Sequence, residues 1–173
     1  IDGSVSYKPI PEVSLYAFGS YLKSKIKENV LNTVDPVTGE EIFFATKGKR
    51  ESGAPTYTFG GRAEGNIGPV AVGIQAKRTG PRYYNDQNLP VMVSGVQVFG
   101  AKIPAYTLVD LDARVSLAAV GLNDNTFLQL NVSNLFDKRY YGGADGGTTS
   151  NSSVIFGQIG APRTVSGTVT IGF

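Results

Sequence analysis

Apolar and polar residues alternate along seven stretches of the chain. Successive side chains of a strand point to opposite faces, so period two over such lengths predicts β-strands. The clearest stretch is 106–117, in which Val109 and Leu111 fall on one face and Asp110 and Asp112 on the other. The predicted strands cover residues 1–7, 13–26, 56–66, 70–77, 106–117, 127–134 and 163–173.

The faces of the stretch 13–26 cannot be assigned from the pattern, because both of its rows contain apolar and aromatic residues. One row holds Leu15, Ala17 and Tyr21, and the other holds Tyr16 and Phe18. Which row faces outward is therefore left open.

The connections between these strands alternate in length. Short turns are predicted at 9–12, 67–69 and 118–125, and long loops at 27–54, 79–104 and 135–162. A small hairpin is expected inside the first loop, through 41–45, and a short strand inside the second, at 91–99. Short turns at one rim and long loops at the other are typical of an outer-membrane β-barrel. The final stretch taken alone fits a soluble β-sandwich equally well, and the loop lengths favour the antiparallel transmembrane barrel.

Composition narrows the function classes. The chain has 22 Gly and 18 Tyr or Phe among 173 residues, which favours a turn-rich β protein. It has no Cys and no His, which removes disulfides and the commonest general base and metal ligand. A net charge of +2 gives no argument for nucleic acid. We expect no catalytic residue, no metal site and no cofactor.

Charged and amide side chains gather on the face opposite the apolar rows. On the lipid face of a barrel such a charge would cost about 2–4 kcal/mol at the bilayer midplane, so we place these residues toward the lumen. Asp110 and Asp112 provide too few oxygen ligands for a hard cation. The predicted lumen-facing polar wall consists of Arg62, Glu64, Gln75, Lys77, Asp110, Asp112, Arg114, Gln129 and Asn131.

The strand count predicts that the barrel is larger than this chain. Bacterial single-chain barrels use an even number of strands, and every edge must be paired in lipid. Seven is odd, and the first predicted strand runs from outside to inside. We therefore expect residues 1–173 to be the C-terminal segment of one barrel domain, with earlier strands missing before Ile1.

Two motifs resemble the C-terminal end of TonB-dependent outer-membrane receptors. They are Asn131-Val-Ser-Asn-Leu-Phe-Asp-Lys-Arg-Tyr-Tyr141 and Gly160-Ala-Pro-Arg-Thr-Val165, followed by the terminal Phe173. The resemblance implies a barrel of about 22 strands closed by an N-terminal plug. It also implies import of a scarce ligand, such as an iron-siderophore, cobalamin or an oligosaccharide, across the bacterial outer membrane. The TonB complex would supply energy through an N-terminal part absent here, and Phe173 would be the barrel-assembly signal.

Residues in the predicted loops are the remaining candidates for contacts with a ligand or with lipid. Tyr83, Tyr84, Tyr140 and Tyr141 are expected in external loops, where aromatic pairs stack on a ligand or anchor the membrane interface. The basic run 47–50 is a candidate contact for lipopolysaccharide phosphates. Expected partners are outer-membrane lipid and lipopolysaccharide, the plug, the TonB complex and a small-molecule ligand. The alternative functions are a passive porin and an outer-membrane barrel enzyme.

Overall fold

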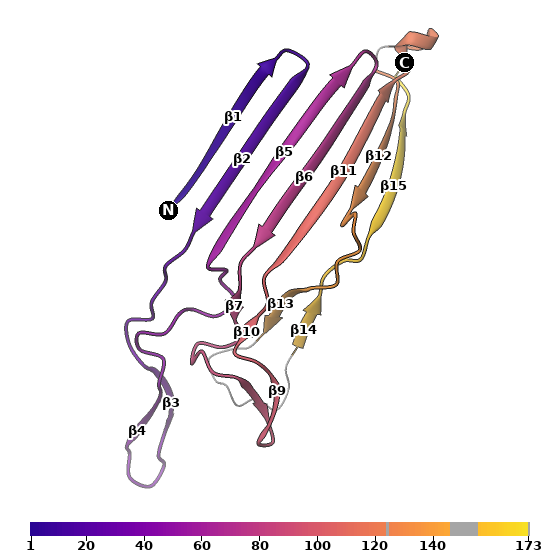
Figure 1. The fold of residues 1–173 in the computed structure, drawn as a ribbon. Helices are drawn as coiled ribbons and strands as arrows, with labels where there is room; N and C mark the ends of the chain where they lie inside the picture. Colours follow the sequence, from indigo (N-terminus) through magenta and orange to yellow (C-terminus); the bar gives the residue numbers. More distant parts are fainter. Residues whose placement is uncertain (124, 146–155, 173) are drawn as a thin grey trace.

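The computed structural model describes residues 1–123, 125–145 and 156–172. Its centre is one antiparallel sheet of seven strands, in which each strand pairs with the next of the seven along the chain (Figure 1). These strands are β1 (Asp2–Ile10), β2 (Val13–Tyr21), β5 (Tyr57–Ile67), β6 (Val70–Thr79), β11 (Tyr106–Ser116), β12 (Phe127–Ser133) and β15 (Thr164–Thr170).

All seven predicted strands are therefore confirmed, with shifts at their ends; the last one, expected to reach residue 173, ends at Thr170. The stretch expected to be a strand to residue 26 ends at Tyr21. The first strand is longer than expected and runs through Pro9 to Ile10, because an irregularity after Tyr7 lets the proline sit outside the regular ladder.

Short and long connections lie at opposite ends of the sheet, as Figure 1 shows. The third short connection contains a 3-10 helix, η1 (Ala118–Val120). Each long loop folds into small two-stranded sheets, and the piece expected at 91–99 is a hairpin rather than one strand. The loop strands are β3 (Val30–Val34), β4 (Glu41–Phe44), β7 (Arg82–Tyr83), β8 (Val91–Val93), β9 (Val96–Phe99), β10 (Lys102–Ile103), β13 (Tyr141–Asp145) and β14 (Phe156–Ile159).

The register of the sheet gives it one apolar face and one polar face. A single row of paired residues crosses all seven strands on the apolar face: Tyr7, Leu15, Ala63, Ile74, Leu111, Val132 and Val165. A neighbouring row, on the polar face, contains Glu64, Asp112 and Asn131. The register also settles β2, because Leu15 lies on the apolar face and Tyr16, paired with Arg62, on the polar one.

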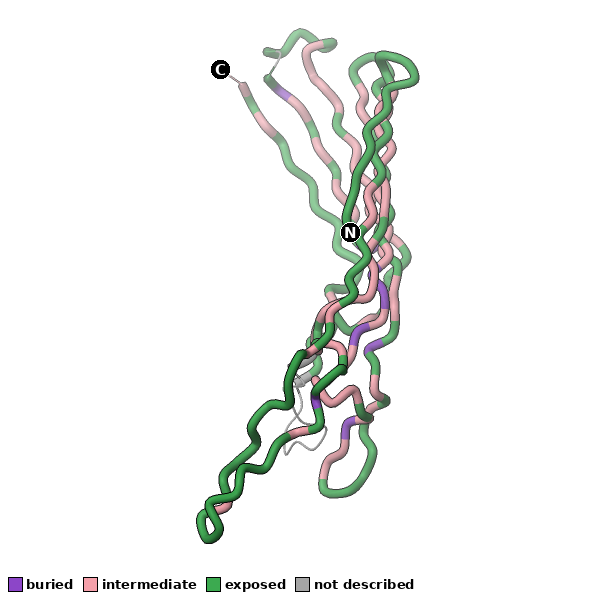
Figure 2. The backbone as a smooth tube through the Cα atoms, turned by 90° about the vertical axis from the view of Figure 1, so that its left-hand side faces the viewer, coloured by how far each residue is buried: buried purple, intermediate pink, exposed green. Residues whose placement is uncertain are grey.

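The sheet is a single layer that does not bury its apolar face within this chain. Figure 2 shows a curved sheet whose residues are mostly exposed or half-buried. On the apolar face Val5 is 63% exposed, Val165 61% and Val169 64%. Among the described residues, the buried apolar side chains are Tyr84, Val91 and Ile103, which all lie in the loop region. Stability of the sheet therefore requires an apolar environment outside the chain.

No helix in the described part of the chain is long and apolar enough to cross a membrane.

Candidate functional site

The nine residues of the predicted polar wall all lie on the polar face. Cross-strand pairing joins Arg62 to Gln75 and Gln75 to Asp110. One row further toward the short turns, Asp112 pairs with Asn131. The spacing of two within each strand brings the other members to the same side. Their orientation toward a lumen stays a prediction.

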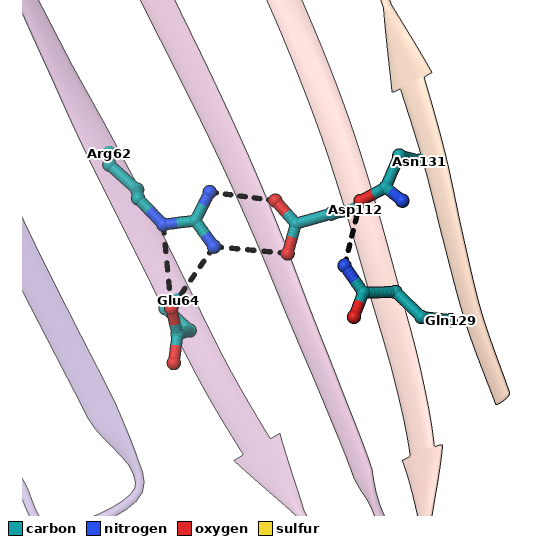
Figure 3. A network of polar contacts seen from close by, with 5 residues as sticks. All are labelled: Arg62, Glu64, Asp112, Gln129 and Asn131. Atoms are coloured by element: carbon teal, nitrogen blue, oxygen red, sulfur yellow. Dashed lines mark hydrogen bonds and ion pairs between the residues drawn. The ribbon is translucent and has the colours of Figure 1, made fainter. Parts of the chain in front are cut away.

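An arginine is held between two carboxylates in the middle of this face (Figure 3). The two terminal nitrogens of Arg62 donate to the two carboxylate oxygens of Asp112, at 2.7 and 3.0 Å. The same guanidinium contacts Glu64 Oε2 at 3.1 Å. Its planar donors match a carboxylate in this two-bond geometry, which fixes the direction of the side chain as well as its charge. The cluster carries one net negative charge.

Gly73 makes the arrangement sterically feasible. Arg62 lies on β5 and Asp112 on β11, and Gly73 is the β6 residue that pairs with Asp112 and with Glu64. A Cβ atom at Gly73 would collide with the Arg62 guanidinium and approach Asp112 Oδ1 to 2.8 Å. The missing side chain therefore lets the arginine cross the intervening strand. Sequence reasoning missed this role, because a lone glycine in a strand does not reveal what crosses it.

The polar face continues toward the short turns. Gln129 Nε2 donates to Asn131 Oδ1 at 3.0 Å, and the Arg114 guanidinium lies 3.6 Å from the centre of the Phe127 ring. A hollow of about 440 Å³ opens here, lined in part by Glu64 and Asp112. Polar groups around an open hollow can dock a polar surface of another domain.

The two sequence motifs 131–141 and 160–165 contact each other at the loop end of the sheet, and we call this set of contacts the clasp. The clasp consists of Asn134, Asp137, Tyr140, Gly160, Ala161 and Arg163. The Arg163 amide donates to Asp137 Oδ1 at 2.9 Å, and the Gly160 amide donates to the Tyr140 carbonyl at 2.8 Å. A Cβ atom at Gly160 would collide with the Tyr140 ring. The motif residues thus bind one another.

Asn134 is the centre of the clasp. It is 4% exposed and has a left-handed backbone, φ 52°, which Asn tolerates better than most residues. Its Nδ2 donates to the carbonyls of Lys138 and Ala161, both at 3.0 Å, and its Oδ1 accepts from the Lys138 amide at 2.8 Å. Its own amide donates to Asp110 Oδ1 at 2.8 Å. Asp110 of the polar wall therefore also anchors the clasp.

A cavity of about 760 Å³ lies beside the clasp at the loop end. Its lining includes the aromatic residues Tyr106, Tyr140 and Tyr141 and the cationic residues Lys138 and Arg139. The Tyr106 and Tyr140 rings are 4.3 Å apart between centres. A cavity of this size, apolar in large part and with a few charges, suits a small-molecule ligand.

Two of the four tyrosines proposed as ligand contacts, Tyr140 and Tyr141, line this cavity. Tyr83 lies elsewhere, with Lys102 Nζ 4.8 Å from its ring centre. Tyr84 lies in the expected loop but is buried there. Its ring stacks on Phe99 at 5.3 Å and is 3% exposed, because the second long loop folds around it. Burial raises the pKa of Tyr84 above its ordinary value.

The basic run 47–50 divides into two parts. Lys47 and Lys49 are exposed. Arg50 instead joins the first long loop to the second: its amide donates to Asn88 Oδ1 at 2.8 Å, and Asn88 Nδ2 returns a bond to its carbonyl at 2.7 Å. Its guanidinium also donates to the Leu22 carbonyl. Phe173, the expected assembly signal, lies outside the described residues.

Comparison with known proteins adds sequence relatives for part of the chain. No protein-family profile matches it. The ferrioxamine B receptor of Salmonella typhimurium is 38% identical over 71 residues, which are 41% of this chain and 9% of that receptor. The metal-pseudopaline receptor CntO of Pseudomonas aeruginosa is 55% identical over 42 residues, 24% of this chain and 5% of that protein. The chain thus matches less than a tenth of the length of these curated relatives.

Solved structures match nearly the whole chain in fold. The siderophore receptor PiuA from Acinetobacter baumannii aligns with 95% of this chain and 20% of its own, with a TM-score of 0.68 and 18% identity. The unliganded ferric citrate transporter FecA covers 90% of the chain, with 20% of its own length, a TM-score of 0.66 and 18% identity. The ferric yersiniabactin uptake receptor FyuA from Yersinia pestis covers 96%, with 22% of its own length, a TM-score of 0.64 and 18% identity.

The matched proteins are receptors and transporters. They confirm the antiparallel barrel architecture, of which this chain is an unclosed part. The chain is therefore similar in sequence, over part of its length, to the ferrioxamine B receptor and the metal-pseudopaline receptor, and it has the fold of part of the barrel of the siderophore receptors that it matches.

Proposed function

We propose that this chain is part of the wall of a receptor that imports a metal–siderophore complex across the outer membrane with energy from the TonB complex. The observation that carries the proposal is the two-faced sheet. Its apolar row crosses all seven strands and is left uncovered, while most of its charged groups gather on the other face. This division suits a wall between lipid and a polar interior. The relatives' names supply the ligand class.

The polar wall is proposed to face the lumen and to seat the plug. Residues 1–173 form part of one barrel domain, and the earlier strands, the N-terminal plug and the TonB contact belong to the rest of the receptor. Arg62 is already neutralised by Asp112, so Glu64 supplies the net negative charge of the cluster. A basic group on the plug would complement that charge.

The cavity beside the clasp is proposed as part of the ligand entrance. Lys138 and Arg139 favour an anionic metal chelate, and the rings of Tyr140 and Tyr141 offer stacking surfaces. Tyr83, which lies outside this cavity, is better suited to the interface with lipid headgroups. Lys47 and Lys49 remain available to lipopolysaccharide phosphates.

The test is uptake of radioactive iron by cells that carry the full-length receptor. Ferrioxamine B, ferric citrate and ferric yersiniabactin serve as separate probes, in strains with and without a functional TonB complex. We expect saturable uptake of a probe that requires both the receptor and TonB. Uptake that persists without TonB, together with ion conductance of the purified protein, would instead establish the passive porin.

A further inference from the structure

The apolar face carries a shallow depression where small residues replace large ones. Ala17, Gly61 and Ala76 are consecutive partners across β2, β5 and β6, and Ala63 lies beside them in the next row. Larger side chains, such as Tyr7 and Ile74, border them, and the depression has a volume of about 390 Å³. Almost all of its surface is carbon, so it suits hydrocarbon and not a polar ligand.

One cation stands at the loop end of this depression. Among the paired positions of the apolar face, all within the described strands, Arg78 is the one charged residue. It follows Ile74 and Ala76 on the same face of β6, and its partner on the neighbouring strand β5 is Phe59. Its Nη1 donates to Thr107 Oγ1 at 3.0 Å, which uses one of five N–H groups.

The dimensions fit a lipid with more than one acyl chain. From the Ala63 row to the Arg78 row is four residues along the strand, or about 14 Å at 3.4 Å per residue. From β1 to β6 is three strand spacings, or about 14 Å, which is wider than a single alkyl chain. The Arg78 end is the end of the long loops, which in the proposed receptor meets the outer leaflet.

We propose that Arg78 and this depression form a binding site for lipopolysaccharide on the outer wall of the barrel. A lipid phosphate accepts hydrogen bonds from the Arg78 guanidinium, and acyl chains lie across Ala17, Gly61, Ala63 and Ala76. Arginine is the side chain best shaped for two parallel bonds to a phosphate. Phe59, 50% exposed beside it, supports the headgroup region. The site rests on the proposed function only in requiring that the apolar face meets lipid.

The experiment measures lipopolysaccharide bound to the full-length receptor after extraction from outer membranes in mild detergent. Bound lipid is quantified by native mass spectrometry. Rebinding is then measured with phosphatidylethanolamine vesicles that contain purified lipopolysaccharide. The variant R78Q removes the charge, and K77Q is its matched control, since Lys77 is on the same strand but on the polar face. R78K retains the charge and tests whether charge alone suffices.

A second pair of variants tests the hydrocarbon part of the site. A17L with A63L fills the depression, and A113L adds one leucine to the same face outside it. Assembly of each variant is checked by the heat-dependent shift in its electrophoretic mobility. R78Q alters only the rim, so the test stands even where the double leucine variant fails to assemble.

We expect R78Q and the filled depression to lower lipopolysaccharide retention about tenfold, the size of one lost charged hydrogen bond. K77Q and A113L should retain the native amount, and R78K an intermediate amount. Equal retention by R78Q and K77Q would overturn the site. Loss of phosphatidylethanolamine in place of lipopolysaccharide would overturn the assigned lipid. Iron uptake is recorded separately, so failure of the import proposal leaves this readout intact.

Discussion

Replacing Asn134 by Ala should open the clasp. The substitution removes three side-chain hydrogen bonds, to Lys138 O, Lys138 N and Ala161 O, at a site that is 4% exposed. At about 1 kcal/mol each these bonds contribute about 3 kcal/mol to the clasp. Ala in the left-handed backbone of this residue costs about 1 kcal/mol more. Glycine adopts the left-handed backbone without this cost, so Asn134→Gly should destabilise the clasp by about 1 kcal/mol less than Asn134→Ala.

The assay is amide hydrogen exchange in the full-length receptor. The Arg163 amide donates to Asp137 and not to Asn134, so its exchange reports opening of the clasp beyond the altered residue. A loss of about 4 kcal/mol in Asn134→Ala corresponds to exchange about 1,000-fold faster, and a loss of about 3 kcal/mol in Asn134→Gly to exchange about 100-fold faster. The control is Asn66→Ala, an exposed asparagine at the short-turn end of β5. Unchanged exchange at Arg163 in Asn134→Ala would refute the clasp.

Three further predictions concern the polar wall, the cavity and the loop core. Gly73→Ala should displace the Arg62 guanidinium from its ion pair while changing the free energy of unfolding by about 1 kcal/mol or less, because both groups are partly exposed. A crystal structure and a urea titration check this. Lys138→Gln with Arg139→Gln should raise the KM of iron uptake about tenfold, because two charges leave the entrance. Tyr84 has a pKa raised by burial, so the loop core should keep its stability below pH 10.0 and lose it as pH rises through that higher pKa, seen as a tyrosinate absorbance transition.

Matched variants isolate each effect. Gly65→Ala places a methyl group on β5 where nothing lies within 4 Å, so the ion pair should stay intact. Lys47→Gln with Lys49→Gln removes two exposed charges far from the cavity along the chain, and uptake should keep its native KM. Tyr84→Phe should lower the amplitude of the alkaline absorbance transition and remove the accompanying loss of loop-core stability, while the other tyrosines still ionise. A wild-type KM for the 138 and 139 variant, or an absorbance transition of unchanged amplitude in Tyr84→Phe, would contradict the reasoning.

The main sheet could be predicted from the sequence because its signals are local. Alternation within each strand indicated all seven strands, and the sorting of short and long connections indicated an antiparallel barrel. The polar wall followed from the same period of two, since Asp110 and Asp112 oppose Val109 and Leu111 in one strand. These inferences need no knowledge of which residues meet across strands.

The features that the sequence did not predict depend on register and on loop packing. The faces of β2 became clear only when Leu15 was found paired with Ala63 in the apolar row. Gly73 matters because of side chains on both neighbouring strands, and the alternating pattern within β6 alone does not reveal those neighbours. Tyr84 resembles any loop aromatic until the hairpin of β8 and β9 folds over it. Long-range pairing decides each of these cases.

The most direct test of the account is site-directed spin labelling along one strand of the full-length receptor in outer-membrane vesicles. This segment contains no cysteine, so cysteines introduced one at a time at residues 107–116 give single labels within it. We predict that labels at Val109, Leu111 and Ala113 are reached by oxygen dissolved in lipid. Labels at Asp110 and Asp112 should be shielded from it. Equal accessibility at alternating positions, or access only to water-soluble reagents, would contradict a wall between lipid and lumen.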